Sequence, residues 1–194
     1  MKSRASFAIL LAAGFCLPAF PRAQNTASAT ENRFASGGRI EMQLDGGNYE
    51  VRPAADDRIR VTSTGNTGSA KVELNTNGTR ADVKVKNTPH NNFQATIEVP
   101  KAADLVIRLS GGNLTMATIA GNKDVESYAG NVTIAVGDPS AYSSIDASVK
   151  AGDIDAGVFG GSKSGLFQKF TWSGHGKYTL RAHLGAGNLV LRSK

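Results

Sequence analysis

The sequence predicts an all-β protein, built as a single-domain parallel β-solenoid of the β-helix or β-roll kind with short coils of about 20 residues. Three observations lead to this prediction. Short runs of alternating apolar and polar residues follow residue 37, and a glycine-containing tetrad recurs among them. No segment in this region keeps an apolar period of 3.6 residues over three turns, so we expect almost no helix.

The alternating runs are the candidate strands. Clear examples lie at 40–44, 58–61, 81–85 and 95–99. Each run places apolar side chains on one face and polar side chains on the other, which is the pattern of a half-buried strand. We therefore expect a core covered by strands whose outer faces are polar.

The tetrad has the form small-Gly-Asn/Asp-apolar and occurs at 46–49, 111–114, 129–132, 151–154 and 186–189. Successive copies from residue 111 onward are 18, 22 and 35 residues apart. Glycine permits the positive φ or close approach that a corner needs, and Asn and Asp tolerate this geometry. Stacked corners would form a turn ladder of Gly47, Asn48, Gly112, Asn113, Gly130, Asn131, Gly152, Asp153, Gly187 and Asn188.

A local alternative explains the same tetrads. Gly-Asn is also an accepted two-residue hairpin turn, and this would give an antiparallel β-sandwich or meander. Periodicity alone does not separate the two folds. The recurrence of the whole tetrad favours the solenoid.

The N-terminal residues 1–23 have the pattern of a signal peptide. Lys2 and Arg4 precede an apolar run from Phe7 to Phe20, and a small residue, Ala23, follows. The run is too short to span a bilayer, which needs roughly 20 apolar residues. We place cleavage after Ala23 and expect an exported protein, periplasmic or extracellular, with no transmembrane segment after cleavage.

The only cysteine, Cys16, lies within this segment. A lipoprotein acylated at Cys16 is an alternative, but bulky Phe15 precedes the cysteine and the apolar run continues beyond it. Cleavage would remove three of the 22 basic residues and no acid, leaving 19 basic against 16 acidic residues. This mild net charge of +3 gives no reason to expect nucleic acid as a partner.

The remaining chain divides by composition. Residues 24–36 are polar and are expected to form a flexible linker. Residues 37–194 form the β-repeat domain. The longest interval between tetrads contains an expected inserted loop or hairpin at 159–176, and residues 167–194 are expected to cap the C-terminal end of the stack.

One stretch resembles a known family. The segment 99–107, Val-Pro-Lys-Ala-Ala-Asp-Leu-Val-Ile, and the tetrads at 111–114, 129–132 and 151–154 are similar to motifs of the bacterial "putative adhesin" family of unknown function. The resemblance covers residues 95–160 well and 37–94 loosely. It implies an exported, glycine-rich β-helix or β-roll and transfers no catalytic residue.

The residues that commonly carry catalysis or bind metals are scattered. His175 and His183 are eight residues apart with no cysteine beside them, which does not suit zinc. Asp153 and Asp155 follow a tetrad, and we interpret them as solvated turn acids. The chain has no nucleophile elbow around a serine and no calcium-binding glycine repeat. We therefore predict no catalytic site, no metal and no cofactor.

An aromatic cluster near the C-terminus is the candidate ligand patch. Its members are Phe170, Trp172, His175, Tyr178, Lys169 and Lys177. The rings could stack on sugars while the lysines bind anions. The competing interpretation is that these residues cap the open end of the solenoid, where the core would otherwise face water.

These observations predict a non-enzymatic envelope or secreted protein that presents a β surface for adhesion or for binding a partner, either a protein or a polysaccharide of the cell envelope. A β-helix carbohydrate-active enzyme is the first alternative, with Asp153 or Asp155 in a groove. An envelope-stress accessory protein that binds a membrane partner is the second.

Overall fold

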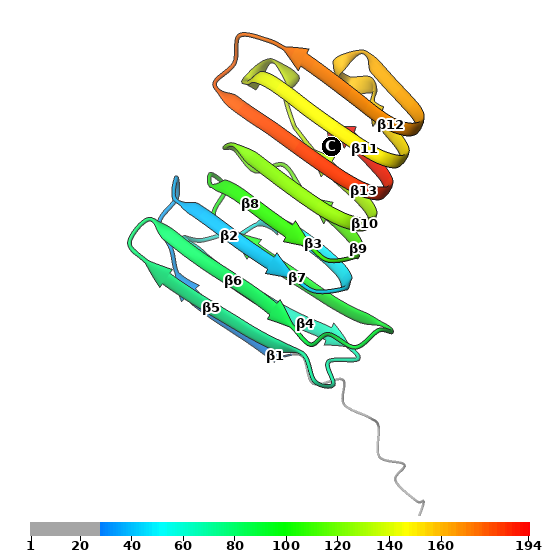
Figure 1. Ribbon diagram of the computed structural model, residues 1–194. Coiled ribbons are helices and arrows are strands. Elements are labelled where there is room, and N and C mark those ends of the chain that lie inside the picture. Colours follow the sequence, from blue (N-terminus) through cyan, green and yellow to red (C-terminus); the bar gives the residue numbers. More distant parts are fainter. Residues whose placement is uncertain (1–27) are drawn as a thin grey trace, which may run out of the picture.

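The computed structural model describes residues 28–194, and these form one mixed sheet of 13 strands that folds over itself into two layers (Figure 1). The all-β prediction is confirmed. The only helical elements described are two short 3-10 turns, η1 (Pro139–Ala141) and η2 (Gly157–Phe159). The expected signal segment, 1–23, lies outside the described residues.

The two layers are joined at the tetrads. The first layer contains β5 (Lys71–Asn77), β6 (Arg80–Lys86), β2 (Arg39–Leu44) and β8 (Asp104–Leu109). The second layer contains β1 (Ser28–Arg33), β4 (Arg58–Gly65), β7 (Phe93–Val99), β3 (Gly47–Pro53) and β9 (Gly112–Met116). Four long strands bend and contribute to both layers: β10 (Lys123–Ala135), β11 (Tyr142–Ala156), β12 (Gly161–Ser173) and β13 (Tyr178–Arg192).

The prediction of a parallel solenoid is wrong for the molecule as a whole, because the sheet is mixed. Parallel pairs occupy its middle, where β2 pairs with β6 and β8, and β10 pairs with β8, β9 and β13. Antiparallel pairs form both ends, where β4 pairs with β1 and β7, β5 pairs with β6, and β11 pairs with β12. The alternative, an antiparallel sandwich or meander, is also wrong, because the strands in the middle of the sheet are parallel.

The strands also do not stack in chain order. Strand β2 lies between β6 and β8, and β3 lies between β7 and β9. Strand β13 lies between β10 and β11. The expected C-terminal cap over 167–194 is therefore wrong for β13, which is internal. The expected loop or hairpin at 159–176 is an edge strand, since β12 runs antiparallel along β11.

The core lies between the layers and is filled by alternate residues of each strand. The burial pattern of β2 shows this, because Ile40, Met42 and Leu44 are buried while their neighbours are exposed. Burying each such side chain stabilises the fold by roughly 1.5–3 kcal/mol. The outward residues are consequently free to form a functional surface.

The linker predicted over 24–36 is wrong from Ser28 onward. Residues Ser28–Arg33 form β1, which pairs with β4, and Phe34 is buried. The polar composition of this segment favours a linker. An edge strand can nevertheless form from polar residues, because it needs only backbone pairing and cross-strand partners. Glu31 supplies these partners by pairing with Arg58 at 2.7 Å and with Arg60 at 2.9 Å.

Candidate ligand-binding groove

A row of polar side chains crosses the outer face of the first layer. Gln43 pairs in register with Arg108, Arg108 with Glu126, Glu126 with His183, and His183 with Ser148. Residues in register on neighbouring strands share one face of a sheet, so these five side chains form a continuous line. We call this line the inner wall.

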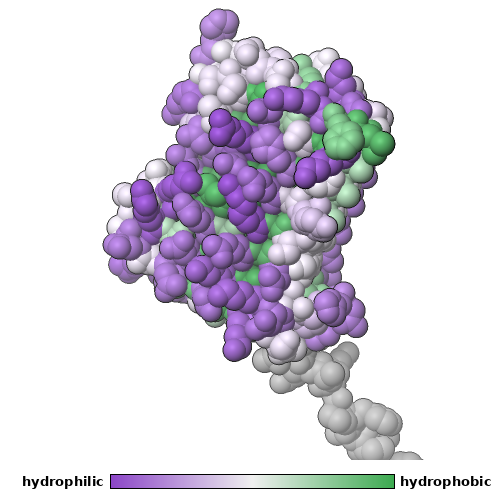
Figure 2. Space-filling model, in the orientation of Figure 1, coloured by the Kyte–Doolittle hydropathy of each residue, from purple (hydrophilic) through white to green (hydrophobic). Residues whose placement is uncertain are grey.

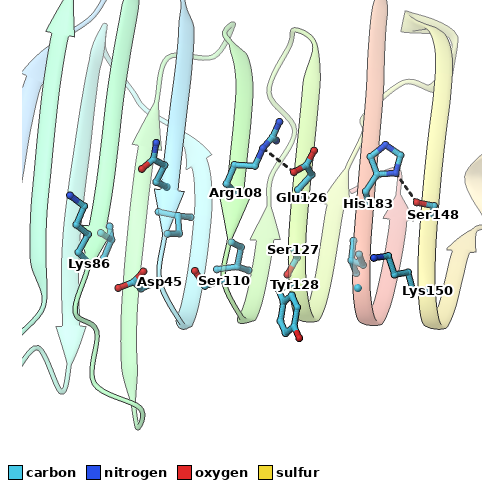
Figure 3. A pocket seen from close by; sticks show the side chains of 16 residues that line it. Asp45, Lys86, Arg108, Ser110, Glu126, Ser127, Tyr128, Ser148, Lys150 and His183 are labelled. Atoms are coloured by element: carbon cyan, nitrogen blue, oxygen red, sulfur yellow. Dashed lines mark hydrogen bonds and ion pairs between the residues drawn. The ribbon is translucent and has the colours of Figure 1, made fainter.

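A second line runs beside it, nearer to the bend between the layers. It consists of Lys86, Asp45, Ser110, Tyr128 and Lys150, and we call it the corner wall. Figure 3 shows the two walls as separate rows of side chains over the same strands. The inner wall comes from β2, β8, β10, β13 and β11. The corner wall comes from β6, β10, β11 and the residues that directly follow β2 and β8. The pairing of segments that are distant in sequence therefore creates both walls.

The space between the walls is an open groove with a volume of about 670 Å³. Its lining residues come from β6, β2, β8, β10, β13 and β11, which are neighbours in that order. Six strands spaced about 4.8 Å apart give the groove a length of about 24 Å, and residues two apart on a strand set the walls about 7 Å apart. The dimensions suit an extended polymer.

The floor of the groove is backbone. Leu44, Leu109 and Leu184 occupy the positions between the walls, but their side chains turn into the core and are 2%, 3% and 2% exposed. The groove therefore offers no deep apolar pockets for the side chains of a peptide. Its accessible groups are hydroxyl, carboxylate, amide, imidazole and cationic groups on the two walls.

Some of the inner-wall side chains are held in place by hydrogen bonds and ion pairs. The Arg108 guanidinium lies 3.0 Å from Asp124 and 3.2 Å from Glu126. Ser148 Oγ and His183 Nδ1 are 2.7 Å apart. These contacts orient donors and acceptors along the groove before any ligand arrives.

Tyr128 is the aromatic centre of the corner wall and is 81% exposed. Gly185 follows on the next strand, where a Cβ atom would overlap the Tyr128 carbonyl oxygen, and Lys150 follows on the strand after that. Glycine leaves the floor bare for about 10 Å between the strands of Tyr128 and Lys150. No ion pair involves Lys150 in the described part of the chain. The Lys150 side chain points toward this bare stretch, whereas the exposed Tyr128 ring at its edge points toward the bend of the strands (Figure 3).

The structure brings the predicted turn-ladder residues together at the bend of the strands. The amide of Asn188 donates to Asn131 Oδ1 at 3.0 Å, Asn131 donates to Asn113 at 3.1 Å, and Asn113 donates to Asn48 at 2.8 Å. Asp153 lies in register with Asn188. Gly112, Gly130, Gly152 and Gly187 stack with φ between 103° and 136°. This ladder shapes the bend below the groove.

The structure does not bring the predicted ligand patch together as an exposed surface. Phe170, Trp172 and Tyr178 pack against the core, and the Trp172 ring lies 4.9 Å from that of Phe159. Lys169 and Lys177 are exposed; Lys169 lies 3.5 Å from Asp146, and Lys177 lies over the Tyr178 ring. His175 is exposed in the turn between β12 and β13.

The predicted catalytic and metal candidates also lie apart. Asp153 and Asp155 are exposed on the second layer, opposite Ser164 and Ser162 of β12. Within residues 28–194, no three His, Cys, Asp or Glu side chains gather where they could hold a metal ion. None of the helices in this range is long and apolar enough to cross a membrane.

The groove is not among the sites predicted from the sequence, although the sequence contains a pattern that indicates it. Every inner-wall residue lies four positions before the glycine at the second position of a tetrad; these residues are Gln43, Arg108, Glu126, Ser148 and His183. The positions two before that glycine are Asp45, Ser110, Tyr128, Lys150 and Gly185. Aligning the chain on its tetrads would have placed these residues in two rows.

Comparisons with known proteins support the fold alone. No family model matches the chain, and no curated protein does. The fold is similar to that of a "putative cell adhesion protein" from Clostridium sporogenes, with a TM-score of 0.55 and 11% identity over 88% of this chain and 100% of that one.

A weaker similarity is to a "putative adhesin" from Bacteroides fragilis, with a TM-score of 0.28 and 8% identity over 86% of this chain and 97% of that one. The Clostridium structure is evidence for the fold alone, because its identity to this chain is low. The Bacteroides structure carries no argument.

Proposed function

We propose that this protein is a non-enzymatic binding protein of the cell envelope, and that its groove holds an extended polysaccharide chain. The observation that carries the proposal is the groove across six strands, in which two polar walls of five side chains each lie on either side of a backbone floor. A sugar ring stacked on exposed Tyr128 would find hydroxyl, carboxylate and cationic partners on both sides. The signal segment expected at 1–23 would bring the domain to the envelope.

The structure-based comparison is in keeping with this role. The similar Clostridium protein bears the description "putative cell adhesion protein", and adhesion requires a ligand at a surface. The groove would supply that ligand site, since its length suits a polymer better than a small metabolite. The binding energy would come from contacts spread along the walls, with Tyr128 at their centre.

The experiment is a binding screen of the chain from Ser28 onward against purified envelope and capsular polysaccharides, measured by calorimetry. For a polysaccharide that binds, Tyr128→Ala should weaken the affinity by about tenfold, as for a central aromatic contact, and Tyr128→Phe should retain it. Thr115→Ala, an exposed change on the second layer, is the control and should have no effect. Equal affinity of Tyr128→Ala and the unaltered protein would refute the groove.

A hydrolase is the second candidate, and one contact favours it. Ser148 Oγ and His183 Nδ1 lie 2.7 Å apart, within the distance needed for an imidazole to accept the proton of a nucleophilic hydroxyl. Hydrolysis of a polysaccharide or a p-nitrophenyl ester that is lost in Ser148→Ala would support the enzyme. Binding without turnover, retained in Ser148→Ala, would support the binding protein.

A further inference from the structure

The two ends of the stacked sheet are built differently. At one end the edge strands β1 and β5 approach each other across the core, and Asn32 of β1 donates a hydrogen bond to the Leu74 carbonyl of β5 at 3.2 Å. At the other end β12 pairs with β11 alone, so one side of its backbone has no strand beside it along Gly161–Ser173. An edge strand of this kind is a template for a further strand.

The middle of β12 places apolar side chains in solvent. Leu166 is 68% exposed and Phe167 is 80% exposed, and Figure 2 shows a hydrophobic patch at the bend of the strands near this end of the molecule. Phe167 has a φ of 52°, in the left-handed region that a non-glycine residue disfavours. A strained conformation that exposes a large apolar ring is typical of a binding site.

The edge strand itself carries charge of one sign. Strand β12 contains Lys163 and Lys169 and no acid, whereas Asp146, Asp153 and Asp155 lie behind it on β11, where Asp146 is 3.5 Å from Lys169. Lys163 and Lys169 lie on β12 itself and are exposed. A second copy of the chain would bring like charges together at this edge, whereas an acidic strand would neutralise them.

We propose that the free edge of β12 is a docking site for an extended, acidic segment of a partner protein, which adds to the sheet as a further strand. Backbone hydrogen bonds would supply the pairing, Lys163 and Lys169 the charge selectivity, and Leu166 and Phe167 an apolar contact. This site is separate from the groove, and neither proposal depends on the other.

The test uses two synthetic ten-residue peptides, one alternating Val and Glu and the other alternating Val and Lys. Trp172 lies on β12 and is the only tryptophan of the chain, so its fluorescence reports binding. We expect the Glu peptide to bind and the Lys peptide not to bind. Methylating alternate backbone nitrogens of the Glu peptide should abolish binding, because the peptide then cannot pair with the edge.

Two variants complete the test. Lys163→Glu should weaken binding of the Glu peptide at least tenfold. Phe167→Gly should weaken it as well without lowering the thermal midpoint, since glycine accepts the positive φ and the ring makes little packing contact. Tyr128→Ala, in the groove, should leave peptide binding unchanged.

Three results would overturn the proposal. One is the absence of binding by the Glu peptide at millimolar concentration, and another is equal binding of the Lys peptide or the methylated peptide. The third is a dimer at micromolar concentration in sedimentation that protects the β12 amides from hydrogen exchange, which would assign the edge to a second copy.

Discussion

The backbone of Gly130 lies so close to the carbonyl oxygen of Gly112 that a Cβ atom on Gly130 would overlap it. The same relationship joins Gly187 to Gly130 and Gly152 to Gly187 along the bend. Close approach of backbone at successive corners lets bent strands pair in both layers at once. The tetrads therefore fix the position of the bend, and the bend places the corner wall of the groove.

Gly130→Ala should destabilise the protein strongly. The substitution adds a steric overlap with the Gly112 carbonyl to the strain of a φ of 119°, and we expect a loss of about 3 kcal/mol or more in the free energy of unfolding. Urea unfolding followed by circular dichroism measures this. Gly78→Ala is the control, because Gly78 also has a positive φ but no atom lies near its Cβ position; a loss as large as that of Gly130→Ala would contradict the account.

Asp153→Asn should extend the amide ladder. Asp153 lies in register with Asn188, whose own amide donates in the opposite direction to Asn131. An asparagine at 153 would gain an N–H donor facing Asn188, and we expect a gain of up to about 1 kcal/mol in the free energy of unfolding. Asp155→Asn removes the same charge two residues away and should give no gain. Thermal unfolding of both variants decides between a ladder effect and a charge effect.

The stability of the protein should rise between pH 8 and pH 10. Lys123 is 2% exposed and donates to the carbonyls of Ile119 at 2.7 Å and Gly121 at 3.1 Å and to the Tyr142 hydroxyl at 2.9 Å. Burial lowers the pKa of Lys123 to about 8, and nearby Asp104 opposes this shift. Above pH 8 the unfolded chain binds more protons than the folded one, so stability increases with pH by up to roughly 3 kcal/mol.

The increase in the free energy of unfolding with pH should end near pH 10. Burial raises the pKa of Tyr142 to about 12, so its unfolded form ionises first and stability falls again as pH increases beyond 10. Urea unfolding at pH 7, 8, 9 and 10 measures the curve. Lys123→Met should be less stable throughout, because it leaves the three acceptors without their donor, and should lose the rise. A rise of the same size in Lys123→Met would show that another group causes it.

The sequence predicted the strands better than their arrangement. Alternating runs such as 40–44 and 95–99 correspond to β2 and β7, because burial of alternate residues is a local property. The position of β13 between β10 and β11 is not local. The four tetrads from residue 111 onward share one corner geometry, with a positive φ at the second residue. Their corners therefore do not distinguish one stacking order from another, and the connections and inward side chains decide the order.

The groove also depends on the pairing of distant strands, so it could not be predicted from residues that are close in sequence. Glu126 and His183 are far apart in sequence and become neighbours only through the pairing of β10 with β13. The aromatic cluster was predicted to be a ligand patch because its members are close in sequence, yet Phe170 and Trp172 pack against the core. Tyr128 has no aromatic neighbour in the sequence, yet it supplies the exposed ring of the groove.

The central claim is that a polymer lies across six strands, and the dependence of affinity on ligand length tests it most directly. For a polysaccharide identified in the screen, oligosaccharides of two to eight units would be titrated calorimetrically against the protein. The account predicts that affinity rises with each unit up to about five, the number that spans a groove about 24 Å long, and then levels off. Full affinity for a disaccharide would contradict it, because a single subsite would then hold the ligand.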